Sequence, residues 1–92
     1  MNTAYKAILG EVLAEKRRAA KINKRQLSLM IGLSRLTIRK IETGVTNPSL
    51  DVLLRITQGV GVSLAEVLQD CERRLSDFPG DELDAPYILF DN

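Results

Sequence analysis

The sequence of 92 residues predicts an all-α fold of about five short helices, followed by an acidic C-terminal tail. Three observations support this prediction. Apolar residues recur at the i, i+3, i+4 spacing of an amphipathic helix, Gly, Pro and Asn residues separate the helical segments, and Ser or Asn stands where a helix start needs an N-cap. A chain of this length can bury one core. We therefore expect one domain at residues 1–75 and the tail at residues 76–92.

The first helix is predicted from about Thr3 to Ala20, because apolar residues recur there at helical spacing with charged residues on the remaining face. The second helix begins after Asn23, a good N-cap residue, and Gln26 three residues later completes a capping-box pattern. It is expected to end near Ile31, because Gly32 breaks the helical pattern.

The third helix is predicted from Ser34, its N-cap, to about Thr43, and the glycine that follows stops it. The segment Asn47–Ser49 opens a fourth helix, which ends at a pair of glycines. Helical spacing in this fourth segment is carried by Leu50, Leu53 and Leu54, with Val52 and Ile56 alongside.

The fifth helix is predicted from a capping-box sequence, Ser63–Glu66, to about Leu75, with Leu64, Val67 and Leu68 mainly in the core. The composition then changes. Residues 76–92 carry five acidic residues and no basic residue, together with three of the four aromatic residues of the chain. Within them, Pro86–Phe90 (PYILF) is too apolar for a purely solvated tail.

The net charge of +1 hides a division between the two halves of the chain. Residues 1–48 carry ten basic and three acidic residues, a net charge of +7. Residues 49–92 carry three basic and nine acidic residues, a net charge of −6. This asymmetry suggests that the first half has a polyanionic partner.

The composition argues against several kinds of chemistry. The chain has no histidine and only one cysteine, Cys71, which excludes a Cys/His zinc site, an intrachain disulfide and His-based catalysis. Neither a Gly-rich phosphate loop nor a nucleophile–base pair is visible. We expect no metal, no cofactor and no enzymatic activity, and Cys71 as a small packing residue. The lack of a membrane span or secretion leader favours a cytoplasmic protein.

The stretch from Lys24 to Glu42 predicts two helices joined by a tight turn. Gly32 falls where such a turn needs a positive φ angle, and Ser28 is small where the two helices would cross. A hydrophobic junction between them would be built by Leu27, Ile31, Leu33, Ile38 and Ile41.

The second helix of this pair keeps an exposed face without acidic residues. That face consists of Ser34, Arg35, Leu36, Thr37, Arg39 and Lys40. Arg and Lys donate to guanine O6 and N7, Thr can serve either base edge, and Leu can contact a thymine methyl group. The N-terminal end of a helix also favours a nearby phosphate. These residue types suit the major groove of DNA.

The segment NKRQLSLMIGLSRLTIRKIETGVTNPSL resembles the helix-turn-helix of the XRE family, the Cro- and phage-repressor-like DNA-binding proteins. The matching positions are Leu27, Ser28, Ile31, Gly32, Ser34, Ile38, Ile41, Glu42, Gly44 and Pro48. The resemblance continues into LLRITQGVGVSLAEVL and covers about Leu9 to Leu68. It implies a five-helix, repressor-like DNA-binding domain, a homodimer, and an operator with two half-sites.

Carried onto this sequence, the resemblance implies two sets of contacts with double-stranded DNA. Base edges would be contacted by Arg35, Leu36, Thr37, Arg39 and Lys40. Phosphates would be contacted by Lys21, Lys24, Ser34, Thr43, Gly44, Thr46 and Asn47.

Two of these positions depart from the usual residues of the family. Lys24 stands where Gln is common, and a lysine reaches a phosphate as a point charge. Lys21 stands where Gly is usual in the loop after the first helix. We therefore expect that loop to be shaped differently here and to gain a phosphate contact.

Two further expectations concern structure. Arg17 and Glu42 match a pair that joins the first and third helices in members of the family, and losing one partner of a buried pair costs about 3–5 kcal/mol. Gly59 falls in the last turn of the fourth helix, where glycine costs about 0.5–1 kcal/mol relative to alanine.

We predict a sequence-specific transcriptional regulator that binds a pseudo-palindromic operator as a homodimer. Two alternatives stay open: an antitoxin that binds a toxin through its tail and autoregulates its operon, and the controller protein of a restriction–modification system. The tail is open as well. It can be a solubilising terminus, a strand across a dimer, a segment packed on its own domain, a binding site for another protein, or a competitor of DNA for the basic face.

Overall fold

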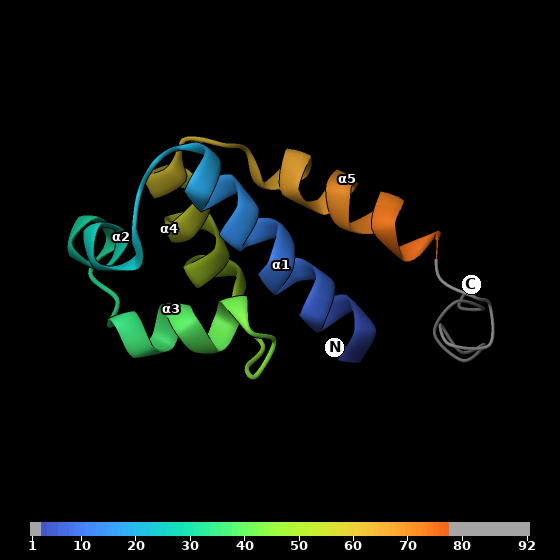
Figure 1. The fold of residues 1–92 in the computed structure, drawn as a ribbon, viewed down its shortest axis with the longest axis horizontal. Helices are drawn as coiled ribbons and strands as arrows, with labels where there is room; N and C mark the ends of the chain where they lie inside the picture. Colours follow the sequence, from blue (N-terminus) through green and yellow to red (C-terminus); the bar gives the residue numbers. More distant parts are fainter. Residues whose placement is uncertain (1–2, 78–92) are drawn as a thin grey trace.

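The computed structural model describes residues 3–77, and these form five α-helices (Figure 1). The helices are α1 (Thr3–Ala19), α2 (Lys24–Ile31), α3 (Arg35–Glu42), α4 (Leu50–Val60) and α5 (Leu64–Leu75). The all-α prediction is confirmed for this part of the chain. Of the predicted tail, residues 78–92 lie outside the described residues. No helix between residues 3 and 77 has both the length and the apolar character needed to cross a membrane.

The helix starts follow the predicted caps. Asn23 and Gln26 form a complete capping box, in which Asn23 Oδ1 accepts from Gln26 N at 2.7 Å and Gln26 Oε1 accepts from Asn23 N at 2.8 Å. Ser34, Ser49 and Ser63 each accept a hydrogen bond from the amide three residues later. At Ser63 only this half of the predicted box forms, because the carboxylate of Glu66 instead receives a hydrogen bond from Lys16.

The hydrophobic core lies where α1 meets the other helices. Its buried members are Ile8, Leu9, Val12, Leu13, Leu27, Ile38, Ile41, Ile56, Val60, Val67 and Cys71. Figure 1 shows α1 alongside α5 on one side and above α3 on the other, and both pairs are in contact. Burial raises the pKa of the Cys71 thiol to about 11. The thiol therefore stays protonated at neutral pH, as a packing residue should.

The apolar spacing that predicted α4 does not mark its buried face. Leu50 is 63% exposed and Leu54 is 39% exposed, although both share the helical spacing with Leu53. The buried residues of α4 are Ile56, Thr57 and Val60. The Thr57 hydroxyl donates to the Leu54 carbonyl at 3.2 Å, which satisfies it inside the core. Spacing defined the helix correctly, but it could not choose between two overlapping apolar stripes.

Close backbone approach explains two glycines inside helices. A Cβ on Gly59 would lie 2.6 Å from Cγ2 of Ile31, so α4 can pass this close to α2 only without a side chain there. A Cβ on Gly10 would lie 2.5 Å from the Glu42 carbonyl oxygen, where α1 passes the end of α3. The helix-propensity cost expected at Gly59 therefore comes with a packing role that the sequence pattern did not reveal.

The loop from α1 to α2 is closed by Lys21 in a left-handed conformation, with φ 62°. Lys21 N donates to Arg18 O at 2.9 Å, and Ile22 N donates to Arg17 O at 3.2 Å. This pair of bonds is a Schellman motif, which usually places glycine at the left-handed position. The loop thus keeps a glycine-like conformation although the residue is lysine.

Candidate nucleic-acid interface

The helix α3 divides into a buried face and an exposed face. Ile38 and Ile41 are buried in the core. The exposed positions on the other side are Arg35, Leu36, Arg39 and Lys40, and Leu36 is 56% exposed. An α-helix with its side chains is about 10–12 Å in diameter, and the major groove of B-DNA, about 12 Å wide, admits one. The residues expected to contact bases thus share one accessible surface, apart from Thr37.

Thr37 is half-buried, and its hydroxyl lies 2.9 Å from the Ser34 Oγ. The same Ser34 Oγ accepts from Thr37 N at 3.0 Å. The structure therefore brings a predicted base-contacting residue and a predicted phosphate-contacting residue together in the N-cap of α3. Any DNA contact from either hydroxyl is made in addition to this cap or in exchange for it.

A shallow concavity lies between the N-terminal ends of α2 and α3. It is lined by Asn23, Lys24, Arg25, Arg35, Leu36 and Arg39. We call this concavity the basic groove, because four of its lining residues are basic: Lys24, Arg25, Arg35 and Arg39. Among residues 3–77, no acidic side chain lies within 4.0 Å of any of these four groups. Uncompensated positive charge in a concave surface attracts polyanions. Arg25 was not among the residues expected to contact DNA, although its place beside Lys24 in the first turn of α2 was an available signal.

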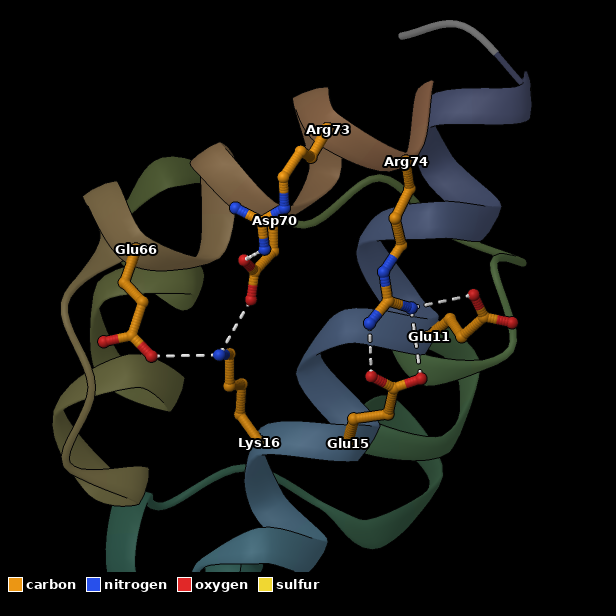
Figure 2. A network of polar contacts seen from close by, with 7 residues as sticks. All are labelled: Glu11, Glu15, Lys16, Glu66, Asp70, Arg73 and Arg74. Carbon is orange, nitrogen blue, oxygen red and sulfur yellow. Dashed lines mark hydrogen bonds and ion pairs between the residues drawn. The ribbon is translucent and has the colours of Figure 1, made fainter. Parts of the chain in front are cut away.

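Basic residues between α1 and α5, unlike those of the basic groove, form ion pairs with acidic side chains (Figure 2). Lys16 Nζ lies 2.9 Å from Glu66 and 2.8 Å from Asp70. Arg74 reaches Glu11 at 3.1 Å and also pairs with Glu15. The contrast with the basic groove makes α2 and α3, rather than the α1–α5 side, the candidate surface for a polyanion.

These ion pairs lower the pKa values of two carboxyl groups. The hydrogen bond from Arg74 holds the pKa of Glu15 below its usual value. The hydrogen bonds from Lys16 and Arg73 do the same to the pKa of Asp70, with Lys16 the larger cause. Both carboxylates are therefore ionised at neutral pH and join α5 to α1.

The loop after α3 contains the remaining residues expected to contact phosphates. Figure 1 shows this loop at the end of α3 away from the turn between α2 and α3. Thr43 and Asn47 are exposed, whereas Gly44 and Thr46 are half-buried. Thr43 Oγ1 donates to Arg39 O at 2.8 Å, and so belongs to the end of α3. Lys24 therefore lies near one end of α3 and this loop lies at the other end. Two groups in these positions are suited to phosphates on either side of a groove.

The C-terminal end of α3 is fixed by an ion pair with α1. Arg17 Nε donates to Glu42 Oε2 at 2.8 Å, and Arg17 Nη2 donates to Glu42 Oε1 at 3.0 Å. The side chains are only 8% and 7% exposed, respectively. Arg17 Nη1 also donates to the carbonyl of Ile22 at 2.9 Å. The structure thus contains the pair expected from the sequence, with the guanidinium satisfied on three sides.

Two helices joined by a tight turn, with an exposed, acid-free basic face on the second, define a DNA-binding helix-turn-helix domain. The helix-turn-helix family model matches residues 13–67. The chain belongs to this family, of the XRE type, whose members are DNA-binding proteins.

Individual relatives agree with this assignment. The chain is 42% identical over 57 residues to the HTH-type transcriptional regulatory protein MJ1164 of Methanocaldococcus jannaschii; the match covers 62% of this chain and 18% of that protein. The chain therefore spans about a fifth of the length of this relative.

Solved structures show the same fold. The clp gene regulator ClgR of Corynebacterium glutamicum superposes with a TM-score of 0.75 at 22% identity, covering 78% of this chain and 77% of that one. The restriction–modification controller protein C.AhdI of Aeromonas hydrophila gives a TM-score of 0.64 at 26% identity, covering 66% of this chain and 92% of that one.

Proposed function

We propose that this chain is a sequence-specific regulator of transcription, which binds a pseudo-palindromic operator as a homodimer. The observation that carries the proposal is the exposed face of α3 together with the basic groove, in a chain of the helix-turn-helix family. A regulator of this kind needs no catalytic group or cofactor, and it acts in the cytoplasm, where its DNA is.

Affinity would come mainly from phosphate contacts. Lys24, Arg25 and Lys21 place positive charge at one end of the motif, and the loop of residues 43–47 offers hydroxyl and amide groups at the other. Each phosphate neutralised by a lysine or arginine releases condensed counterions, so binding weakens steeply as salt increases. These contacts fix the register of α3 on the duplex.

Specificity would come from the outer face of α3. Arg35, Arg39 and Lys40 are long donors suited to guanine O6 and N7, and Leu36 is an apolar group suited to a thymine methyl. Two copies of the chain would place two such helices in successive major grooves, with half-site centres about 34–36 Å apart. We expect the operator to show this spacing as an inverted repeat.

The test is selection of bound sequences from a random double-stranded DNA library, with the full chain and with a variant that ends at residue 77. We expect an enriched inverted repeat for both, and a dimer–DNA complex by sedimentation. An Arg35→Ala variant should change the enriched motif, whereas Arg73→Ala on the exposed side of α5 should leave it unchanged. Absence of any enriched motif with the full chain overturns the proposal.

A narrower second candidate is the controller protein of a restriction–modification system. The observation that favours it is the likeness to C.AhdI, which is matched over 92% of its length at 26% identity. Genes for a restriction enzyme and its methyltransferase next to this one, and operator sites upstream of them, would support this candidate. Operators only at unrelated genes would exclude it and leave the general proposal intact.

A further inference from the structure

The turn between α2 and α3 is held by a side chain from α4. Arg55 Nη2 donates to the Ile31 carbonyl at 2.6 Å and to the Gly32 carbonyl at 3.5 Å. Ile31 is the last residue of α2, and Gly32 is its left-handed C-cap, with φ 73°. The last carbonyls of a helix lack intrahelical donors and form the negative end of its dipole. A guanidinium group matches this end in both charge and hydrogen bonding.

The next two carbonyls of the turn are also occupied. The Ser28 hydroxyl donates to the carbonyl of Leu33, and Ile38 N donates to the carbonyl of Ser34 at 3.1 Å. Four consecutive carbonyl groups, from residue 31 to residue 34, therefore each receive a donor. Two of the four depend on Arg55, so the path of the turn depends on α4 as well as on the two motif helices.

The guanidinium group lies close against the turn. Asp51, one helical turn earlier on α4, has its carboxylate 4.0 Å from Arg55 Nη1. A Cβ on Gly32 would lie only 3.2 Å from Arg55 Nη2, which shows how closely the group packs on the backbone. Because α4 also packs against α2, the arginine joins a neighbouring packed helix to the segment that leads into α3.

We propose that Arg55 is a positioning residue for DNA recognition, which fixes the turn between α2 and α3 and so sets the angle at which α3 presents its outer face. This inference rests on the proposed function, because it takes α3 to be the helix that reads DNA. Arg55 acts through α3, because its Nη2 group donates to backbone carbonyls of the protein itself.

Three variants test the inference. Arg55→Met keeps the length of the side chain and removes its donors, and Arg55→Lys keeps the charge with a single point of donation. Arg73→Met is the matched control, because it removes the same charge from a side chain that is 70% exposed on α5.

The first measurement needs no DNA. Amide hydrogen exchange at Gly32 and Ile38, whose amides donate to Ser28 O and Ser34 O, reports opening of the turn. We expect exchange about tenfold faster in Arg55→Met, the size of effect that loss of a charged hydrogen bond produces. Arg55→Lys should be intermediate, and Arg73→Met should match the unsubstituted chain. Unchanged exchange in Arg55→Met overturns the inference.

The second measurement is affinity for the selected operator and for unrelated DNA as a function of salt. We expect Arg55→Met to bind the operator about tenfold more weakly, with unrelated DNA and the salt dependence unchanged. An equal loss for both DNAs, with the slope of log K against log salt smaller by about one, would make Arg55 a phosphate contact and overturn the inference.

Failure of the proposed function can be distinguished from failure of this inference. If the proposed function fails, the unsubstituted chain enriches no operator. Amide exchange at Gly32 still decides whether Arg55 holds the turn. Should Arg55→Met not fold, Arg55→Lys carries the same two comparisons, with faster exchange and a smaller loss of operator affinity expected.

Discussion

Gly10 in α1 lies directly against the backbone of Glu42 at the end of α3, so that a Cβ on Gly10 would be 2.5 Å from the Glu42 carbonyl oxygen. Two helical turns further along α1, Arg17 makes two hydrogen bonds to the side chain of the same Glu42. One face of α1 therefore holds the C-terminal end of α3 twice, by backbone contact and by a buried ion pair. The position of α3 depends on both.

Replacing Glu42 by Gln should destabilise the protein strongly. It would leave the guanidinium group of Arg17 buried without its counter-charge, at a cost of about 3–5 kcal/mol. Urea denaturation measures this as a lower transition midpoint. The exposed Glu72→Gln is the control and should change the midpoint little. Equal midpoints for Glu42→Gln and the unsubstituted chain would contradict the structural role of the pair.

Gly10→Ala should also be destabilising, although alanine in a helix interior usually gains about 0.5–1 kcal/mol over glycine. The added methyl group would meet backbone atoms, which yield little, so a net loss of about 1–3 kcal/mol is expected. Gly59→Ala should cost less, because its new neighbours are side-chain ends of Ile31 and Leu27. Thermal unfolding of both variants checks this order of stability, and a melting temperature higher for Gly10→Ala than for Gly59→Ala would refute it.

Lys21→Gly should separate stability from DNA binding. Lys21 has φ 62°, a conformation that costs a non-glycine residue about 1–2 kcal/mol. Glycine should therefore raise the melting temperature while binding to DNA weakens, with a salt slope smaller by about one. Lys21→Ala is the control, because it removes the charge and keeps the side-chain strain. Equal melting temperatures for the two variants would show that the backbone account is wrong.

The α1–α5 ion pairs should make stability fall in acid. The pKa values of Glu15 and Asp70 are lowered in the folded state, so their contribution is present above the unfolded pKa values of 4.5 and 3.8 and is lost as the pH falls through the folded values. Melting temperatures between about pH 5 and pH 2 measure this loss. The double variant Glu15→Gln, Asp70→Asn should show a smaller decrease than Glu72→Gln. Parallel curves for the two would exclude the α1–α5 ion pairs as the cause.

Arg35→Ala and Lys24→Ala should weaken DNA binding in different ways. Loss of a base contact at Arg35 should cost about 1–3 kcal/mol and relax selectivity at one base pair. Loss of a phosphate contact at Lys24 should weaken binding to all sequences alike and reduce the salt slope by about one. Binding to a set of single-base operator variants distinguishes the two. Uniform weakening in Arg35→Ala would assign Arg35 to the phosphate-contacting group.

The helix starts were predictable because an N-cap is a local interaction. Asn23 and Ser34 each bond to an amide three residues away, so the sequence around them contains the whole signal. The exposure of Leu54 was not predictable, since several rotations of α4 are compatible with its apolar residues. The contact of Arg55 with Ile31 joins residues 24 positions apart and depends on the tertiary arrangement of α4 and α2.

The candidate site follows the same division. The exposed cations of α3 could be predicted by subtracting the apolar positions of one short helix. The basic groove could not, because Arg25 and Arg39 come together only when α2 and α3 take up their crossing angle. Ser28 was expected to be small for packing, yet its hydroxyl also bonds to the carbonyl of Leu33. A hydroxyl that spans the turn is visible only in three dimensions.

The attachment of α3 has a consequence for how such a protein can change. The residues that hold the helix are Ile38, Ile41 and Glu42, whereas the residues that face outward are Arg35, Leu36, Arg39 and Lys40. The two sets share no member. Under the proposed function, new combinations at the outward positions would leave the framework undisturbed and would retarget the chain to a different operator, by evolution or by an engineer, without a change of fold.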